Sequence, residues 1–346
     1  MAGPAVHIGA RIEDAVHAVR ERWGRRAGLI PAIVPFVGYG GDGWIRVLAR
    51  VVLRKPGVLP RDRFTSVRGW RSFTSITVRD AEVTITAGDA TGVVHSDRGG
   101  VIDARFAVSL PPGWSNVVLS IGSKTGGGGM VDSMGVPVPI FVVDESTDFG
   151  MVSDVDDTVM VTLLPRPFLA AWNSFVINEH ARTPVAGMPV LYERLAAAHP
   201  GSPVVYLSTG AWNVVPTLTR FLSRNLYPPG PLLLTDWGPT NERWFRNGAE
   251  HKLASLDLLA TEFPGIRWLL IGDDGQADET TYGIFAERHP ESVRAVAIRQ
   301  LTPGQAVLAG GRSNARTHRR GSAPWVYASD GAGLNSQLRD LDLDLL

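Results

Sequence analysis

Apolar residues in the first half of the chain recur at every second position. The stretches from Ile45 to Leu53 and from Ile102 to Leu110 alternate apolar and more polar residues, which is the period of half-buried antiparallel strands. Further strands are predicted at 75–87, 116–121 and 137–143, because clusters of Gly, Asp and Pro separate them. The pattern predicts a small all-β sandwich domain over residues 31–145.

A helical period precedes this region. Apolar residues recur at three- and four-residue spacing opposite charged positions, namely Ile12, Ala15, Val16, Val19 and Trp23. Residues 1–30 are therefore predicted to form an N-terminal amphipathic helix. Packing of its apolar stripe on its own domain is favoured over binding at a membrane interface, because interfacial helices are usually richer in basic residues.

From about residue 146 the pattern changes to short, wholly apolar runs that alternate with helical stretches. The runs lie at 149–153, 203–207, 231–234, 268–271 and 293–298, and the helices at 188–199, 213–225, 251–262 and 279–289. This alternation is typical of an α/β domain whose parallel sheet is covered on both faces. Residues 146–302 are predicted to form that domain, with its site at the carboxyl ends of the strands. After residue 302 the periodicity fades, and residues 303–346 are predicted to be a mobile tail.

Composition narrows the classes of function. The chain has 346 residues, 44% of them hydrophobic and 20% charged, and no net charge, which favours two folded domains and argues against nucleic acid as a partner. Without cysteine, thiolate metal ligands and cysteine nucleophiles are excluded. The absence of a signal-peptide pattern predicts a cytoplasmic protein. Peripheral membrane contact stays open, because basic and aromatic residues mix between Arg54 and Phe73.

Carboxylates follow two of the apolar runs. Asp154 and Asp156 come directly after the run at 149–153, and Asp273, Asp274 and Asp278 follow the run at 268–271. Carboxylates crowded at neighbouring strand ends repel one another, so a bridging cation is the natural compensation, and hard oxygen ligands favour Mg²⁺. Two distant stretches of chain are therefore predicted to share one metal ion.

Other polar residues stand at comparable positions. Ser208 and Thr209 follow the run at 203–207, where hydroxyl and N–H groups could bind phosphate oxygens. Lys252 is expected in the first turn of the helix at 251–262, where a cation opposes the helix dipole. A role in pairing with carboxylates or with a substrate phosphate is one interpretation of this lysine, and a solvated surface lysine is the other.

In this order, Asp154-x-Asp156-x-Thr158, Ser208, Lys252 and Gly272-Asp273 with Asp278 resemble the four motifs of the haloacid dehalogenase superfamily. The resemblance implies a Rossmannoid parallel sheet with a small cap. It also implies that Asp154 attacks phosphorus, that Asp156 serves as acid and then base, that Lys252 stabilises the nucleophile and that Ser208 binds phosphate. The implied ligands of Mg²⁺ are Asp154, Asp156 through its carbonyl, Asp273 and Asp278, with the choice between Asp274 and Asp278 as second acid left open.

Residues 145–300 further resemble the catalytic domain of actin-patch-type phosphatidate phosphatases, through Trp172-Asn173, Tyr206 to Asn213, His251-Lys252 and Ile271 to Tyr282. That family implies Mg²⁺-dependent hydrolysis of phosphatidate to diacylglycerol. The sequence departs from it at Thr209-Gly210-Ala211 and at Asp274. Two alternatives therefore stay open: a phosphatase of the same chemistry acting on a soluble metabolite or a protein, and a binding or scaffold protein with a disused site.

Overall fold

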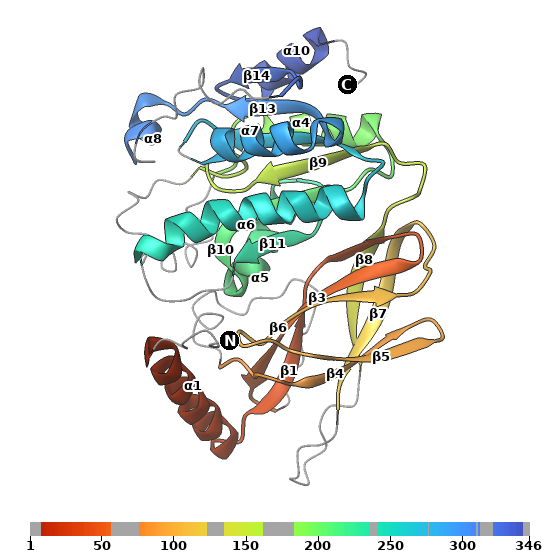
Figure 1. The fold of residues 1–346 in the computed structure, drawn as a ribbon, viewed down its shortest axis with the longest axis vertical. Coiled ribbons are helices and arrows are strands. Elements are labelled where there is room, and N and C mark those ends of the chain that lie inside the picture. Colours follow the sequence, from red (N-terminus) through yellow and green to blue (C-terminus); the bar gives the residue numbers. More distant parts are fainter. Residues whose placement is uncertain are drawn as a thin grey trace, which may run out of the picture.

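The computed structural model describes residues 8–56, 76–122, 135–161, 183–235, 241–275, 277–308, 311 and 321–341. Figure 1 shows a β-rich region, built from the first part of the chain, beside a region in which helices cover a sheet. Several sequence predictions lie outside the described residues: the basic and aromatic residues between Arg61 and Phe73, the pair Trp172-Asn173 and the small cap.

The β-rich region is one mixed sheet of eight strands. These are β1 (Ile30–Pro35), β2 (Gly38–Gly41), β3 (Trp44–Arg54), β4 (Glu82–Ala87), β5 (Ala90–His95), β6 (Val101–Ala107), β7 (Gly113–Ile121) and β8 (Val136–Val142). Their order is β1-β3-β2-β8-β7-β4-β5, and β6 pairs with β3. The pairing is antiparallel as expected, except that β2 and β8 run parallel. The sandwich arrangement stays a prediction.

The period of two explains this sheet. Inward-facing residues of β3 such as Ile45, Val47 and Val51 are fully buried and share one core with Ile85 and Leu119 of other strands. Between β4 and β5 the turn is Gly88-Asp89, and Gly88 has φ 58°, a left-handed conformation that glycine adopts without strain. The predicted turn cluster is confirmed at this point.

The second region contains a six-stranded sheet with the order β11-β10-β9-β12-β13-β14, and all its pairs are parallel. Its strands are β9 (Phe149–Asp154), β10 (Val204–Ala211), β11 (Leu232–Thr235), β12 (Arg267–Asp273), β13 (Val293–Arg299) and β14 (Trp325–Ala328). The helices of this region are α4 (Met188–Ala198), α5 (Val215–Arg224), α6 (Asn241–Glu262), α7 (Asp278–Arg288), α8 (Pro303–Leu308) and α10 (Gly331–Asp340). Two short 3₁₀ helices lie at Trp212–Val214 and Pro290–Ser292.

Two sequence predictions for this region are wrong. The predicted tail instead supplies β14, which extends the sheet beside β13, and α10, whose Leu334 and Leu338 are fully buried. A four-residue strand and a short helix with few apolar residues carry too little periodicity to be recognised. The helix containing Lys252 begins at Asn241 rather than 251, so Lys252 lies well inside α6 and the expected opposition to the helix dipole does not apply.

The N-terminal helix α1 (Ile8–Arg26) forms as predicted, but its stripe does not pack as expected. Val19 and Trp23 are the stripe residues whose side chains the structure describes, and both are exposed. The helix instead lies against the β-rich region through Gly24, where an added Cβ would come within 2.8 Å of Leu53 Cδ1. His17 Nε2 lies 2.5 Å from Thr77 Oγ1 on the same side.

The two regions share one hydrophobic core. Aromatic side chains of β2 and β3 pack against the end of α6 and the start of β12, with Trp44 and Phe263 5.4 Å apart between ring centroids. Phe36 stacks on Trp212 at 5.4 Å and 11° between planes. Trp212 is therefore a core residue that joins the two regions.

An ion pair joins the regions beside these rings. Arg46 of β3 donates from Nη2 to Glu262 Oε1 at 2.8 Å, and Tyr39 donates from its hydroxyl to Glu262 Oε2 at 2.8 Å. Arg46 also contacts Asp103 at 2.5 Å. The Glu262 side chain is 6% exposed, so removing its cationic partner would leave a desolvated carboxylate.

We predict that Arg46→Met destabilises the protein by about 3 kcal/mol, because Glu262 is left as an uncompensated buried charge. The measurement is urea unfolding followed by circular dichroism. Arg25→Met is the matched control, since its pair with Glu21 on α1 is more exposed and is worth less than about 1 kcal/mol. Equal losses in the two variants would contradict the prediction.

Candidate active site

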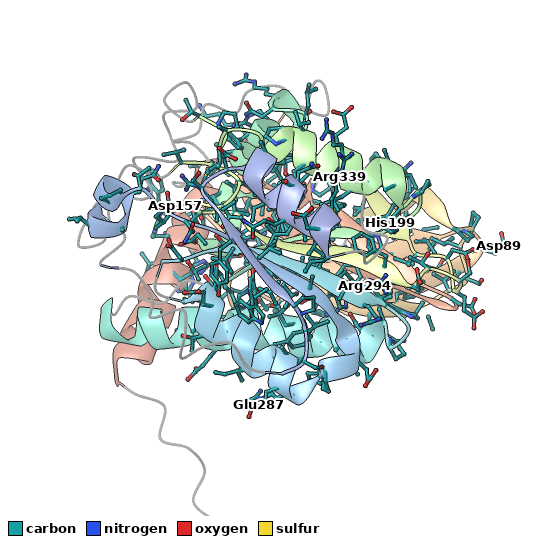
Figure 2. All side chains as sticks on the ribbon, turned by 90° about the horizontal axis from the view of Figure 1, so that it is seen from above. Asp89, Asp157, His199, Glu287, Arg294 and Arg339 are labelled. Carbon is teal, nitrogen blue, oxygen red and sulfur yellow. The ribbon has the colours of Figure 1, made fainter. Side chains whose placement is uncertain are left out.

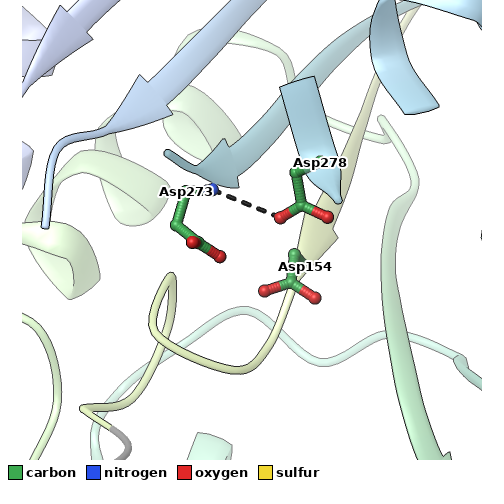
Figure 3. Close-up of side chains that lie close together, drawn as sticks. All are labelled: Asp154, Asp273 and Asp278. Carbon is green, nitrogen blue, oxygen red and sulfur yellow. Dashed lines mark hydrogen bonds between the residues drawn. The ribbon is translucent and has the colours of Figure 1, made fainter. Parts of the chain in front are cut away.

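Three carboxylates converge where β9 and β12 end. Asp154 is the last residue of β9, Asp273 is the last residue of β12, and Asp278 begins α7. One oxygen from each lies within 4.8 Å of the others, and Figure 3 shows the three side chains turned toward one another. Because β9 and β12 are neighbours in a parallel sheet, their carboxyl ends meet at one edge, as the sequence predicted.

Lys252 reaches this group from α6. Its Nζ donates to Asp154 Oδ1 and to Asp278 Oδ1, each at 2.6 Å. Lys252 is 5% exposed and the two carboxylates are 2% exposed each. Charge-assisted hydrogen bonds of this length in a water-poor site hold all three side chains in fixed positions. The predicted pairing of Lys252 with carboxylates is therefore present.

The group remains short of positive charge. Three carboxylates and one ammonium carry a formal charge of −2. Burial, and then the charge of Asp278, raises the pKa of Asp154 well above its usual value, with Lys252 acting in the opposite direction. Burial and the neighbouring Asp278 and Asp154 likewise raise the pKa of Asp273. Each shift reflects a cost of holding negative charge at this place.

A divalent cation fits this donor set. Three acidic oxygens at close range are ligands that a hard cation accepts, and a charge of +2 balances the excess of the group. Asp278 belongs to the set, whereas Asp274 Oδ1 accepts a hydrogen bond from the Leu301 N–H at 2.7 Å. Of the two acids that the sequence left open, Asp278 is the one that faces Asp154 and Asp273.

Asp156 lies two residues beyond β9 and has a different partner. Ser208 Oγ donates to Asp156 Oδ2 at 3.1 Å, so the Asp156 side chain faces the end of β10, and its carboxylate is not one of the three that converge. Ser208 Oγ in turn accepts from the Gly210 N–H at 3.0 Å. The structure thereby brings the predicted acid–base residue and the predicted phosphate-binding hydroxyl together.

Thr209, the residue after Ser208, contacts α6. Its Cγ2 faces Gly248 of α6, where an added Cβ would lie 2.9 Å away, and its carbonyl accepts from Thr235 Oγ1 at 2.8 Å. The methyl group of Thr209 thus packs on the helix that carries Lys252. The absence of a side chain at Gly248 lets α6 approach β10 closely, which brings Lys252 over the strand ends.

Gly272 has a comparable role beneath Asp278. An added Cβ would lie 2.7 Å from Asp278 Oδ2 and 2.7 Å from Tyr282 Cε2. The first turn of α7 therefore packs directly on the backbone of this glycine. It allows the Asp273 N–H to reach Asp278 Oδ2 at 3.2 Å, so the two acids are held at a fixed spacing.

Sequence reasoning missed Arg299, the last residue of β13. Its Nη1 donates to the carbonyl of Asp157 at 2.5 Å and its Nη2 to Gln305 Oε1 at 2.8 Å. Asp157 has φ 59°, a left-handed conformation that a non-glycine residue rarely adopts. Arg299 therefore anchors the turn that follows Asp154. A cation at the end of a parallel strand was the available signal, since that is where ligands and charged groups gather.

The turn after Asp154 also leads into the segment beyond the sheet. The Asp157 N–H donates to the Met160 carbonyl at 2.8 Å, and the Val161 N–H to the Thr183 carbonyl at 3.0 Å. Residues 161 and 183 thus lie side by side, a short way along the chain from Asp157. In Figure 2, Asp157, which follows β9, is labelled on the left, and His199, which precedes β10, is labelled further to the right. The carboxyl ends of these parallel strands therefore lie on the left, the side to which the β9 arrow points in Figure 1.

Comparisons with known proteins point to the same segment. The family described as phosphatidate phosphatase APP1, catalytic domain, matches residues 149–300, the stretch that supplies Asp154, Lys252, Asp273 and Asp278. Residues 149–300 form an APP1-like catalytic domain. The APP1 phosphatidate phosphatase of Saccharomyces cerevisiae is 26% identical over 153 residues, which is 43% of this chain and 25% of the relative. The chain thus aligns with a quarter of that protein's length.

Other similarities are weaker. A 4-diphosphocytidyl-2-C-methyl-D-erythritol kinase from Cereibacter sphaeroides is 28% identical over 221 residues, 57% of this chain and 76% of the relative. Among solved structures, a carbohydrate acetylesterase from Xanthomonas citri has a TM-score of 0.33 at 9% identity, covering 91% of this chain and 73% of its own. The PilB minor pilin from Streptococcus sanguinis has a TM-score of 0.26 at 9% identity, with 96% and 98% covered. Scores this low establish no shared fold.

We predict that a divalent cation stabilises the protein, because it relieves the repulsion among Asp154, Asp273 and Asp278. MgCl₂ should raise the Tm in differential scanning fluorimetry, and a chelator should reverse the change. Asp273→Asn should remove most of this shift, whereas the surface variant Asp257→Asn should retain it. A full shift in Asp273→Asn would show that the cation binds elsewhere.

Proposed function

We propose that the chain is a Mg²⁺-dependent phosphatase that hydrolyses a phosphomonoester through an aspartyl-phosphate intermediate, with phosphatidate as substrate and diacylglycerol as product. The observation that carries the proposal is the convergence of Asp154, Lys252, Asp273 and Asp278 within the segment that matches the APP1 catalytic domain. The name of the yeast relative supports phosphatidate as the substrate.

Asp154 is the proposed nucleophile. A carboxylate needs no general base, but its charge must be masked before it can approach an anionic phosphate. Lys252 does this by donating to Asp154 Oδ1. Asp154, Asp273 and Asp278, with the carbonyl of Asp156, would hold Mg²⁺, which when bound offsets the charge of the nucleophile and of the phosphoryl group.

In the first step a carboxylate oxygen of Asp154 forms a bond to phosphorus, and the ester bond between phosphorus and the leaving oxygen breaks. Asp156 gives its proton to that oxygen, so an alcohol leaves. Its hydrogen bond from Ser208 Oγ keeps the Asp156 carboxyl group near the end of β10. We assign the binding of a phosphate oxygen there to the hydroxyl of Ser208, which can donate to phosphate in place of Asp156.

In the second step Asp156, now ionised, takes a proton from water as the water oxygen attacks phosphorus. The bond between phosphorus and Asp154 breaks, releasing inorganic phosphate and restoring both aspartates. Lys252 stays paired with Asp278 at 2.6 Å throughout, so its ammonium group remains in place whichever form Asp154 takes. The same carboxyl group thus serves first as general acid and then as general base.

We predict that Asp154→Asn lowers phosphate release to less than about one-thousandth of the parent rate, because the amide is not a nucleophile. Release is measured with Mg²⁺ on vesicles that contain phosphatidate and on soluble phosphate esters. The exposed variant Asp144→Asn is the control and should keep full activity. Asp154→Asn should keep the parent Tm or exceed it, since one buried negative charge is gone, so lost activity would not reflect unfolding.

A substrate panel tests the lipid assignment separately. We expect turnover of phosphatidate in vesicles to exceed that of soluble phosphomonoesters at matched concentration. Preference for a soluble ester, with Asp154→Asn inactive on it, would retain the chemistry and overturn the substrate. Absence of turnover on every ester with Mg²⁺ would favour a binding protein with a disused site.

A further inference from the structure

The outward face of α1 combines apolar and basic residues that the protein leaves exposed. Trp23 is 69% exposed and Val19 is 63% exposed, although soluble proteins usually bury tryptophan. They stand four residues apart and therefore on one face of the helix. The packed side of the helix lies about a third of a turn away, where His17 and Gly24 contact the β-rich region.

Arginines surround these two side chains. Arg20, Arg22 and Arg26 are exposed and flank Val19 and Trp23 along the helix. The acid in this part of α1 is Glu21, which lies toward the packed side and accepts from Arg25 at 2.8 Å. On a chain without net charge, the described end of α1 thus presents a basic surface around an apolar centre.

The helix α1 and the carboxyl end of β9 lie toward the same side of the molecule. In Figure 1 the arrow of β9 points toward the side on which α1 lies, and in Figure 2 Asp157, which follows β9, is labelled on that same side. A membrane bound through α1 would therefore lie on the side of the molecule toward which β9 points.

We propose that the Val19–Trp23 face of α1 docks the protein on anionic lipid membranes. Tryptophan and arginine are the residues that settle at the boundary between head groups and acyl chains, where the ring is partly buried and the guanidinium meets lipid phosphates. Each arginine near an anionic leaflet adds attraction that falls with salt. Among the described residues no helix is long and apolar enough to cross a membrane, so contact through α1 would be peripheral.

The proposal deepens the proposed function, since docking would bring the site to a lipid substrate that stays in the bilayer. It also explains why Val19 and Trp23 of the apolar stripe stay exposed on the described part of the chain. A second copy of this chain is the other occupant that such a face could accept. The charge of the three arginines favours lipid, because two copies meeting through this face would bring like charges together.

The test measures binding and catalysis separately. Vesicles of phosphatidylcholine, with and without phosphatidylserine, are sedimented with the parent protein, with Val19→Ser/Trp23→Ala and with Arg20→Gln/Arg22→Gln. Phosphatidylserine is not a phosphomonoester, so binding does not depend on the phosphatase assignment. We expect the parent to bind anionic vesicles in preference to neutral ones, and each double variant to bind about tenfold more weakly. Trp114→Ala, at the other exposed tryptophan on β7, is the control and should bind like the parent.

Catalysis gives the second measurement. The double variants should lose turnover of phosphatidate at low vesicle concentration, recover it at high concentration and keep the parent rate on a soluble ester. Unchanged vesicle binding in Val19→Ser/Trp23→Ala would overturn the proposal. So would a parent dimer in analytical ultracentrifugation that this variant converts to a monomer. Inactivity of the parent on all esters, with anionic binding lost in the variants, would overturn the proposed function and leave the docking surface standing.

Discussion

The arrangement of the site depends on one buried cation, the ammonium group of Lys252. It joins Asp154 at the end of one strand to Asp278 at the start of one helix, and without it three carboxylates would face one another in a region with little water. Its position depends on the close packing of α6 on β10, which Gly248 permits. The arrangement of helix against sheet is thus fixed by the same contacts that hold Lys252 against Asp154 and Asp278.

The buried carboxylates of this site lower the stability of the folded protein, and such groups are typical of sites that carry out chemistry. Burial raises the pKa values of Asp154 and Asp273, because a carboxylate charge is less stable in the buried site than in water. Such a cluster is typical of functional sites, where the cost of desolvation is offset elsewhere in the fold. Here the offset lies in the wholly apolar strands beneath, whose residues such as Leu270 and Ile271 are fully buried.

How much the sequence could predict varied with the physical signal. Strands β9, β10, β12 and β13 were located closely because parallel strands are apolar throughout, and the convergence of Asp154 and Asp273 followed from neighbouring strand ends. The start of α6 was missed because Gly248 and its polar neighbours interrupt the periodicity. Arg299 was missed because its role is a hydrogen bond to a backbone carbonyl, which no side-chain pattern encodes. The exposure of Val19 and Trp23 on α1 was missed, because the periodicity reveals an apolar stripe but not whether another surface covers it.

The shared core has a consequence for how the chain can be divided. The segment that matches the APP1 catalytic domain ends at residue 300, yet β14 follows it and shields β13. Before its first residue lie Phe36 and Trp44, which cover Trp212 and Phe263. If residues 149–300 were transplanted into another protein, the rings of Trp212 and Phe263 would lose this cover. The almost wholly buried strand β13 would also become an open sheet edge, which can pair with strands of other chains. The segment that the family model matches is therefore shorter than the part of the chain that shares one hydrophobic core.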